Sequence, residues 1–125
     1  MSPHAGRTPG PGHPIAIAPA GGRVVVRFGD EVIVDTRDGL LLRESTYPGV
    51  FYLPRADARM ERLRRSDRHT YCPYKGQASY FSLPGDSEAA TDAIWTYEDP
   101  YDAVAPIKDH LAFYADRVHI EHTPD

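Results

Sequence analysis

Residues 23–36 (RVVVRFGDEVIVDT) are two β-branched runs on either side of Gly29-Asp30. Valine, isoleucine and threonine are typical of strands, and a Gly-Asp pair between two such runs is typical of a tight turn. The segment therefore predicts a β-hairpin with strands at Arg23–Phe28 and Glu31–Thr36.

The rest of the chain continues this pattern of short strands separated by turns. Helical signals are limited to residues 56–63 and to a turn that begins at Asp99-Pro100 and breaks at Pro106. The alternating βα pattern of a parallel sheet is absent. The sequence therefore predicts a mainly β, small antiparallel domain with one or two short helices. The further strands are expected at Leu40–Glu44, 50–53, 69–71, 79–83, 93–97, 110–114 and 118–121.

Composition and length limit what kind of protein this is. With 125 residues the chain has the usual size of one domain. Its 14 basic and 18 acidic side chains give a formal charge of −4, which argues against a nucleic-acid or anionic-membrane partner. No apolar run approaches the length of a signal peptide or a membrane span. We expect a cytoplasmic protein, because the one cysteine suits a reducing compartment.

Domain boundaries follow from the distribution of proline and glycine. Residues 1–22 hold five of the 12 prolines and five of the ten glycines, which disfavours helix and central strand. We expect residues 1–12 to be a flexible tail and residues 13–125 to be a single domain. Within it, residues 13–20 (HPIAIAPA) alternate apolar residues and could lie along the domain as an extended edge segment.

The densest polar and aromatic run lies at residues 69–80 (HTYCPYKGQASY). Pro73 and Gly76 favour a turn whose backbone N–H groups form a concave nest for an anion. Lys75 adds a positive charge, and an ammonium group beside a thiol makes that thiol more nucleophilic. Cys72 is therefore the candidate catalytic residue. Polar, loop and aromatic residues around it are the candidate ligand-binding residues: Arg59, Thr70, Lys75, Gly76, Ser79, Tyr80, Trp95 and Tyr97.

Each of these signals also has a purely structural explanation. A single cysteine is most often a small buried side chain, and Cys-Pro-Tyr-Lys-Gly could simply be a turn. Aromatic residues at alternating strand positions, such as Trp95 and Tyr97, are more often packing residues than ligand contacts.

Arginines form the only basic concentration in this acidic chain, between residues 55 and 68. Such a run can hold phosphate or carboxylate, but it is more often a solvated face paired with nearby acidic residues. Arg59 is the arginine we expect at the site, because it lies in the helical turn that leads toward the Cys-Pro-Tyr-Lys-Gly loop. The six histidines show no metal-binding spacing, so we expect no metal and no cofactor.

Several motifs together resemble one bacterial family, known as domain of unknown function 427. They are His13-Pro14-Ile15, residues 23–36, 52–57 (YLPRAD), 70–76 (TYCPYKG), Ser79-Tyr80, 95–97 (WTY) and 113–118 (FYADRV). The resemblance covers nearly the whole chain beyond residue 12. It implies a small β-tent fold similar to the guanine-exchange chaperone of the Mss-four type, to methionine sulfoxide reductase B and to the thalidomide-binding domain of cereblon. Many proteins of that shape hold zinc with paired cysteines, which this chain lacks.

The resemblance says less about activity. The family sometimes carries a nucleotidyltransferase-like label, but no paired aspartate motif of a two-metal site is visible here. Two functions remain open. The first is a pocket around the Cys-Pro-Tyr-Lys-Gly loop that binds a small anion or a planar metabolite, with catalysis through Cys72 as an extension. The second is a non-enzymatic module that binds a peptide or protein, with the loop purely structural.

Overall fold

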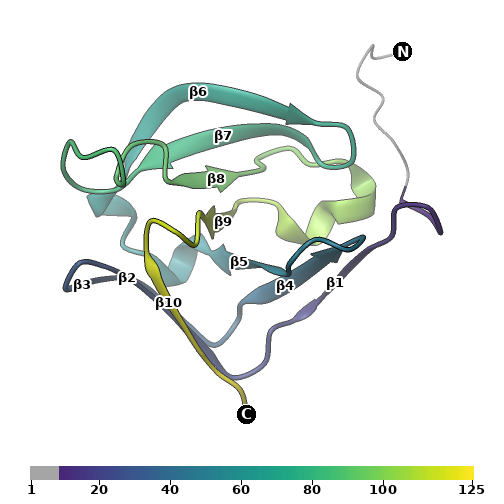
Figure 1. Cartoon of the computed structure of the whole chain (residues 1–125), viewed down its shortest axis with the longest axis horizontal. Coiled ribbons are helices and arrows are strands. Elements are labelled where there is room, and N and C mark those ends of the chain that lie inside the picture. The colour runs from purple at the N-terminus through teal and green to yellow at the C-terminus, as the bar shows by residue number, and fades with distance from the viewer. Residues whose placement is uncertain (1–8) are drawn as a thin grey trace.

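The computed structural model describes residues 9–125, which form two antiparallel sheets (Figure 1). The larger sheet has seven strands in the order β1-β4-β5-β9-β8-β7-β6, and the smaller has three in the order β10-β2-β3. Three short 3-10 helices complete this part of the chain, so the predicted mainly β class is confirmed. The bounds are β1 Ile15–Pro19, β2 Arg23–Phe28, β3 Glu31–Thr36, β4 Leu40–Glu44, β5 Val50–Pro54, η1 Arg55–Asp57, η2 Met60–Arg62, β6 Arg64–Cys72, β7 Gly76–Ser82, β8 Ile94–Thr96, η3 Asp102–Ile107, β9 His110–Phe113 and β10 His119–Thr123.

The predicted hairpin forms the centre and one edge of the small sheet. Phe28 pairs with Glu31 across the turn, where Gly29 has a φ of 61° that a side chain would strain. β10 covers the other side of β2, so the last strand of the chain closes the sheet that the hairpin begins.

The segment before the hairpin joins the large sheet. β1 is an edge strand and pairs with β4, with Ile17 opposite Leu42. The expected flexible tail covers residues 1–12, of which residues 1–8 lie outside the described part of the chain. Gly10 and His13 pair through backbone hydrogen bonds of 2.9 and 3.3 Å across a short turn.

The helical prediction for residues 56–63 is replaced by two separate 3-10 turns, η1 and η2. The break has a physical cause, because the Arg59 N–H donates to the carbonyl of Ile33 at 2.9 Å. A backbone donor committed to a neighbouring strand cannot serve an uninterrupted helix. The turn predicted after Asp99-Pro100 is η3, which contains Pro106.

β6 is longer than expected and begins at Arg64 rather than His69. Its pairing with β7 shifts register between Arg65 and His69. The first half of this strand contains none of the β-branched or aromatic residues that are typical of strands, and it includes an aspartate, so it has no local strand signal. It is a strand because β7 provides a partner.

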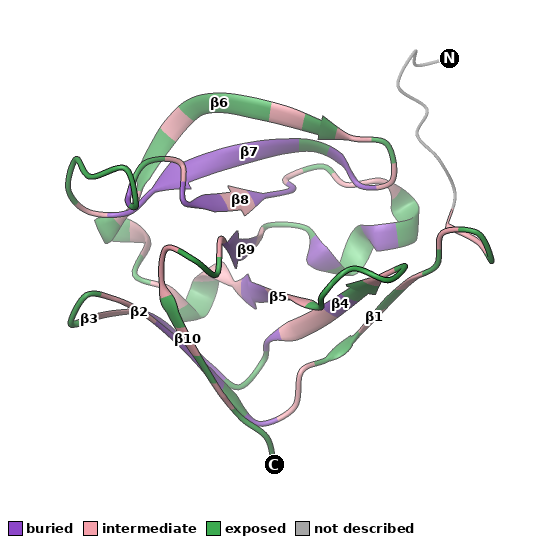
Figure 2. Ribbon diagram, viewed as in Figure 1, coloured by how far each residue is buried: buried purple, intermediate pink, exposed green. Residues whose placement is uncertain are grey.

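The core consists of two apolar clusters. One lies between the small sheet and the β7-β8-β9 strands and includes Val26, Ile33 and Leu111. The other lies against β4, β5 and η3 and includes Leu42 and Tyr52. Figure 2 shows how burial concentrates on β7, β8 and β9. Within residues 9–125, no helix has the length and apolar character needed to cross a membrane.

Candidate functional site

The Cys-Pro-Tyr-Lys-Gly run is the hairpin turn between β6 and β7. The Lys75 N–H donates to the Cys72 carbonyl at 3.3 Å, and the Lys75 carbonyl accepts from Tyr101 at 3.0 Å. Gly76 has a φ of 108°, a conformation that other residues rarely adopt. The turn is therefore fixed by backbone hydrogen bonds and by glycine.

Lys75 turns inward from this hairpin and pairs with a carboxylate from another strand. Its side chain is only 8% exposed, and its Nζ donates to Oε1 of Glu44 at the end of β4. The other oxygen of Glu44 lies 2.6 Å from Nε2 of His13, whose ring stacks on Tyr74 at 3.9 Å. Nζ of Lys75 also lies 3.8 Å from Sγ of Cys72.

The Glu44 carboxylate is ionised. Burial by itself raises the pKa of Glu44, but hydrogen bonds from Lys75 and His13 outweigh burial and hold that pKa below its usual value. The positive charge of Lys75 is therefore balanced by its own partner before any ligand arrives.

A cavity of about 250 Å³ opens beside this ion pair. Six aromatic side chains line it, from β5, β7 and β8 and from the segments that precede β5 and follow β8 and β9. Lys75 and Glu44 contribute the charges, and Leu42, Pro48 and Val50 complete the wall. We call this the aromatic cavity; its aromatic residues are Tyr47, Tyr52, Tyr80, Trp95, Tyr97 and Tyr114.

Hydroxyl groups give the aromatic cavity its polar character. The Tyr52 hydroxyl accepts from Nε1 of Trp95 at 3.2 Å, and the Tyr80 hydroxyl lies 2.9 Å from the Thr70 hydroxyl. Burial raises the pKa of both Tyr52 and Tyr97 far above the usual range. These phenols stay protonated and can donate hydrogen bonds to a ligand.

The structure divides the sequence-predicted site residues into groups. Lys75, Tyr80, Trp95 and Tyr97 come together in the aromatic cavity. Thr70 and Gly76 line a different, open hollow of about 520 Å³ beside Tyr71 and Tyr101.

The other three predicted residues are not among the lining residues of the aromatic cavity. Cys72 is half-buried and packs against the second core cluster. The Ser79 hydroxyl is 3.4 Å from Nδ1 of His69. Arg59 is exposed and lines neither hollow; the pKa of nearby Glu31 is lowered chiefly by a hydrogen bond from Arg62, and the charge of Arg59 adds to this effect.

Sequence reasoning missed seven of the eleven residues that line the aromatic cavity, among them Glu44 and three tyrosines, Tyr47, Tyr52 and Tyr114. One signal was available for Glu44. Side chains alternate along a strand, so Glu44 shares a face with Leu42, and a carboxylate on the buried face of a strand needs a partner. The three tyrosines reach the cavity only through long-range strand pairing.

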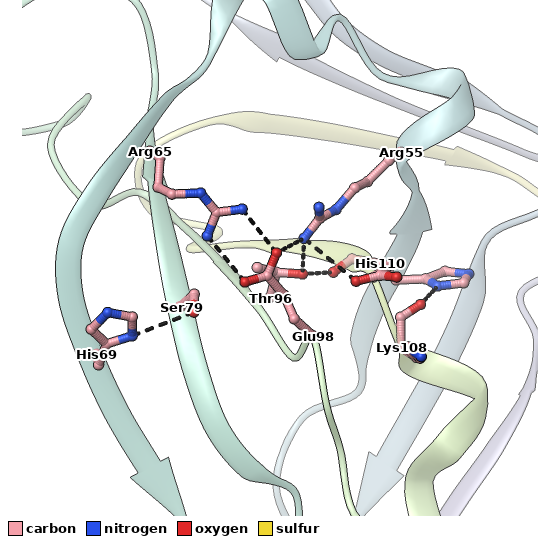
Figure 3. A network of polar contacts seen from close by, with 9 residues as sticks. Arg55, Arg65, His69, Ser79, Thr96, Glu98, Lys108 and His110 are labelled. Carbon is pink, nitrogen blue, oxygen red and sulfur yellow. Dashed lines mark hydrogen bonds and ion pairs between the residues drawn. The ribbon is translucent and has the colours of Figure 1, made fainter.

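The arginines form a second polar cluster, drawn in Figure 3. Nη2 of Arg55 donates to Thr96 and to Glu98, both at 3.1 Å. Arg65 holds the same carboxylate with two hydrogen bonds of 3.0 and 2.8 Å. Hydrogen bonds from Arg65, partly opposed by burial, and then from Arg55 lower the pKa of Glu98 to about 2.

This cluster, Arg55-Glu98-Arg65 with Thr96, is a structural brace. The guanidinium groups of Arg55 and Arg65 lie 5.4 and 4.9 Å from the centre of the Phe81 ring. Thr96 is fully buried and donates to the His110 carbonyl at 2.7 Å. Both arginines are thus engaged within the protein, as is Arg62 with Glu31. The acidic partners are distant in sequence rather than the neighbouring residues.

Metal ligands do not gather in the described part of the chain. Among residues 9–125, no three His, Cys, Asp or Glu side chains are placed to hold a metal ion.

Comparison with known proteins supports the motif-based resemblance. No curated protein matches the chain. One family, described as a domain of unknown function (DUF427), matches residues 16–123, which include every strand from β2 to β10 and all the residues of the aromatic cavity. The chain therefore belongs to the DUF427 family.

Proposed function

We propose that this protein binds a small planar ligand in the aromatic cavity. The observation that carries the proposal is the convergence of six aromatic side chains on one hollow that ends at a balanced ion pair. Aromatic faces stack on planar groups, and protonated tyrosine hydroxyls supply directional hydrogen bonds. The cavity volume of about 250 Å³ is small for a ligand pocket and suits one ring rather than a nucleotide.

The charge distribution favours an uncharged planar ligand over a free small anion. Lys75 is the only cation among the lining residues, and Glu44 already neutralises it. An anion would have to compete with a carboxylate that is built into the wall. The hydroxyls of Tyr52 and Tyr97 can serve a carbonyl or amide oxygen without displacing anything.

The test uses the single tryptophan, because Trp95 lines the cavity and its fluorescence reports occupancy. The intact protein is titrated with benzamide, nicotinamide, benzoate and inorganic phosphate. We expect saturable quenching by benzamide or nicotinamide and none by phosphate. Absence of saturable quenching by every planar probe would overturn the proposal, and tight binding of phosphate alone would favour the small-anion alternative.

A matched pair of tyrosine variants locates the binding. Tyr47 is 65% exposed at the cavity, and Tyr71 is 44% exposed beside the other hollow. Tyr47→Ala should weaken the planar probes about three- to tenfold, the value of one aromatic contact. Tyr71→Ala should leave the affinity unchanged. Equal losses in both variants would place the binding elsewhere.

Catalysis by Cys72 has one supporting contact, its 3.8 Å approach to Nζ of Lys75. A charge that is already paired with Glu44 activates a thiol less than a free one. Alkylation of the native protein with iodoacetamide tests the idea: rapid modification that saturating benzamide slows would support a reactive thiol at the site. Modification only after unfolding would assign Cys72 to the core.

A further inference from the structure

A second hollow adjoins the aromatic cavity on the side of β10. Its volume is about 320 Å³. It shares five lining residues with the aromatic cavity, namely Tyr47, Pro48, Val50, Trp95 and Tyr114. The five shared residues make the two hollows immediate neighbours.

The two hollows differ in chemistry. Beyond the shared residues, the second hollow is lined by Phe51, Leu53, Phe113 and Ile120 with Gly49 and Ala115, and none of its lining side chains is charged. The aromatic cavity instead contains Lys75, Glu44 and buried phenols. We call the second hollow the apolar annex.

Trp95 and Tyr114 stand at the junction of the two. Their ring centroids are 4.7 Å apart, and both residues line both hollows. The polar edge of the indole is directed to the Tyr52 hydroxyl, a residue of the aromatic cavity alone. In a ligand that extends from one hollow into the other, the polar groups would therefore lie near Tyr52. The part of the ligand at the junction would contact an apolar surface.

We propose that the ligand is amphipathic, with a planar polar ring in the aromatic cavity and an aliphatic chain in the apolar annex. This inference rests on the proposed function and specifies the ligand class. Apart from the residues that it shares with the aromatic cavity, the annex has no hydrogen-bonding or charged side chain. A hydrocarbon substituent is therefore the group whose burial there contributes most to binding. A purely polar ligand would leave that surface in contact with water.

The test compares benzamide with 4-butylbenzamide on the intact protein by Trp95 fluorescence and calorimetry. Each methylene that is fully buried strengthens binding about fourfold, so we expect at least a tenfold gain from the butyl group. Ala115 is exposed and lines the annex alone, which makes it a site for blocking the chain without disturbing the core. Ala115→Phe should remove most of the butyl gain and leave benzamide affinity unchanged, and Ala115→Ser is the matched control.

The outcomes separate the two proposals. If benzamide binds and the butyl group adds less than threefold, or if Ala115→Phe leaves the gain intact, the amphipathic ligand is wrong and the planar-ligand function stands. If neither compound quenches Trp95, the proposed function fails and the annex inference fails with it. A butyl gain that Ala115→Phe abolishes and Ala115→Ser retains establishes the annex.

Discussion

Glu44 and Glu98 are each held by two basic side chains, yet their surroundings differ. Glu44 lies between Lys75 and His13 on the wall of the aromatic cavity, and its side chain is 16% exposed. Glu98 lies between Arg55 and Arg65 at the brace and is 35% exposed. The partners of Glu98 are both arginines, which keep their charge at every pH the protein meets. The partners of Glu44 are a lysine and a histidine.

The comparison shows that a carboxylate between two basic side chains occurs in two different settings in this fold. Two arginines around one carboxylate, backed by Phe81 and Thr96, make a fixed connection between η1, β6 and β8. A lysine and a histidine around Glu44 make a pair that is more deeply buried and faces an open cavity. We expect the contacts of Glu98 to contribute little to the free energy of unfolding. Removing the contacts of Glu44 should lower that free energy more.

The largest expected effect comes from Glu44→Gln. This change leaves the buried Lys75 ammonium without its carboxylate, and breaking such a pair costs about 3 kcal/mol of unfolding free energy. Glu98→Gln, the matched change at the brace, should cost about 1 kcal/mol because solvent screens that pair. Urea unfolding of both variants measures the two values.

The double variant Glu44→Leu, Lys75→Met keeps this comparison interpretable. It removes both charges, so it should unfold at a higher urea concentration than Glu44→Gln. Equal losses in the two single glutamine variants would contradict the distinction between the clusters.

Thr96→Val tests whether the brace depends on its buried hydroxyl rather than on its exposed ion pairs. The change removes the donor to the His110 carbonyl and the acceptor for Arg55. We expect a loss of about 1–2 kcal/mol, the cost of leaving a buried carbonyl unsatisfied. Thr91→Val, which removes an exposed hydrogen bond to Ser87, is the control and should cost less than about 0.5 kcal/mol. A control loss as large as that of Thr96→Val would refute the interpretation.

Acid titration of stability sharpens the description of Glu98. Its pKa is about 2 in the folded protein against an ordinary value of 4.5. A depressed carboxyl pKa stabilises the fold above the unfolded pKa, and the contribution is lost as pH falls from about 4.5 toward 2. Over this window the unfolding free energy of Glu98→Gln should fall by about 1 kcal/mol less than that of the natural protein, after allowance for solvent screening. Parallel curves for the two proteins would show that the ion pairs add nothing.

The smallest expected effect is that of His13→Gln. The variant loses the ring that stacks on Tyr74 and, if the amide does not reach, the bond to Glu44. We expect the free energy of unfolding to fall by about 0.5–1 kcal/mol, because Lys75 still neutralises the Glu44 carboxylate. His119→Gln is the control, since its ring is 70% exposed and lies 3.4 Å from Glu121. If His13→Gln were as damaging as Glu44→Gln, the histidine rather than the lysine would be the main partner.

The strands were predictable where a local pattern specifies them. The β-branched runs of β2 and β3 and the Gly29-Asp30 turn suffice for the hairpin, because its contacts lie between neighbouring residues. The first half of β6 was not predictable, since arginines at 64 and 65 become strand only by pairing with β7. The break at Arg59 has the same origin, a hydrogen bond to a strand elsewhere in the sequence.

The candidate site was predictable only in part, for a related reason. Lys75 and Trp95 lie in short motifs that are rich in polar and aromatic residues, and such motifs can be recognised in the sequence. Glu44 is 31 residues from Lys75 and is the last residue of an ordinary strand, so its role depends on how β4 is placed beside the hairpin turn. Only the folded sheet brings these two groups into contact.

The position of β6 at one end of the seven-stranded sheet has a consequence for association between molecules. An edge strand exposes backbone groups that can recruit a strand from another chain and start aggregation. β6 carries exposed Arg64, Arg65 and Arg68 along that edge, and the opposite edge strand, β1, ends in Pro19, which cannot donate a backbone hydrogen bond. Two copies of β6 would repel each other by charge. The three arginines of β6 thus disfavour edge-to-edge pairing of two molecules, a role that is separate from the bonds of Arg65 to Glu98 in the brace.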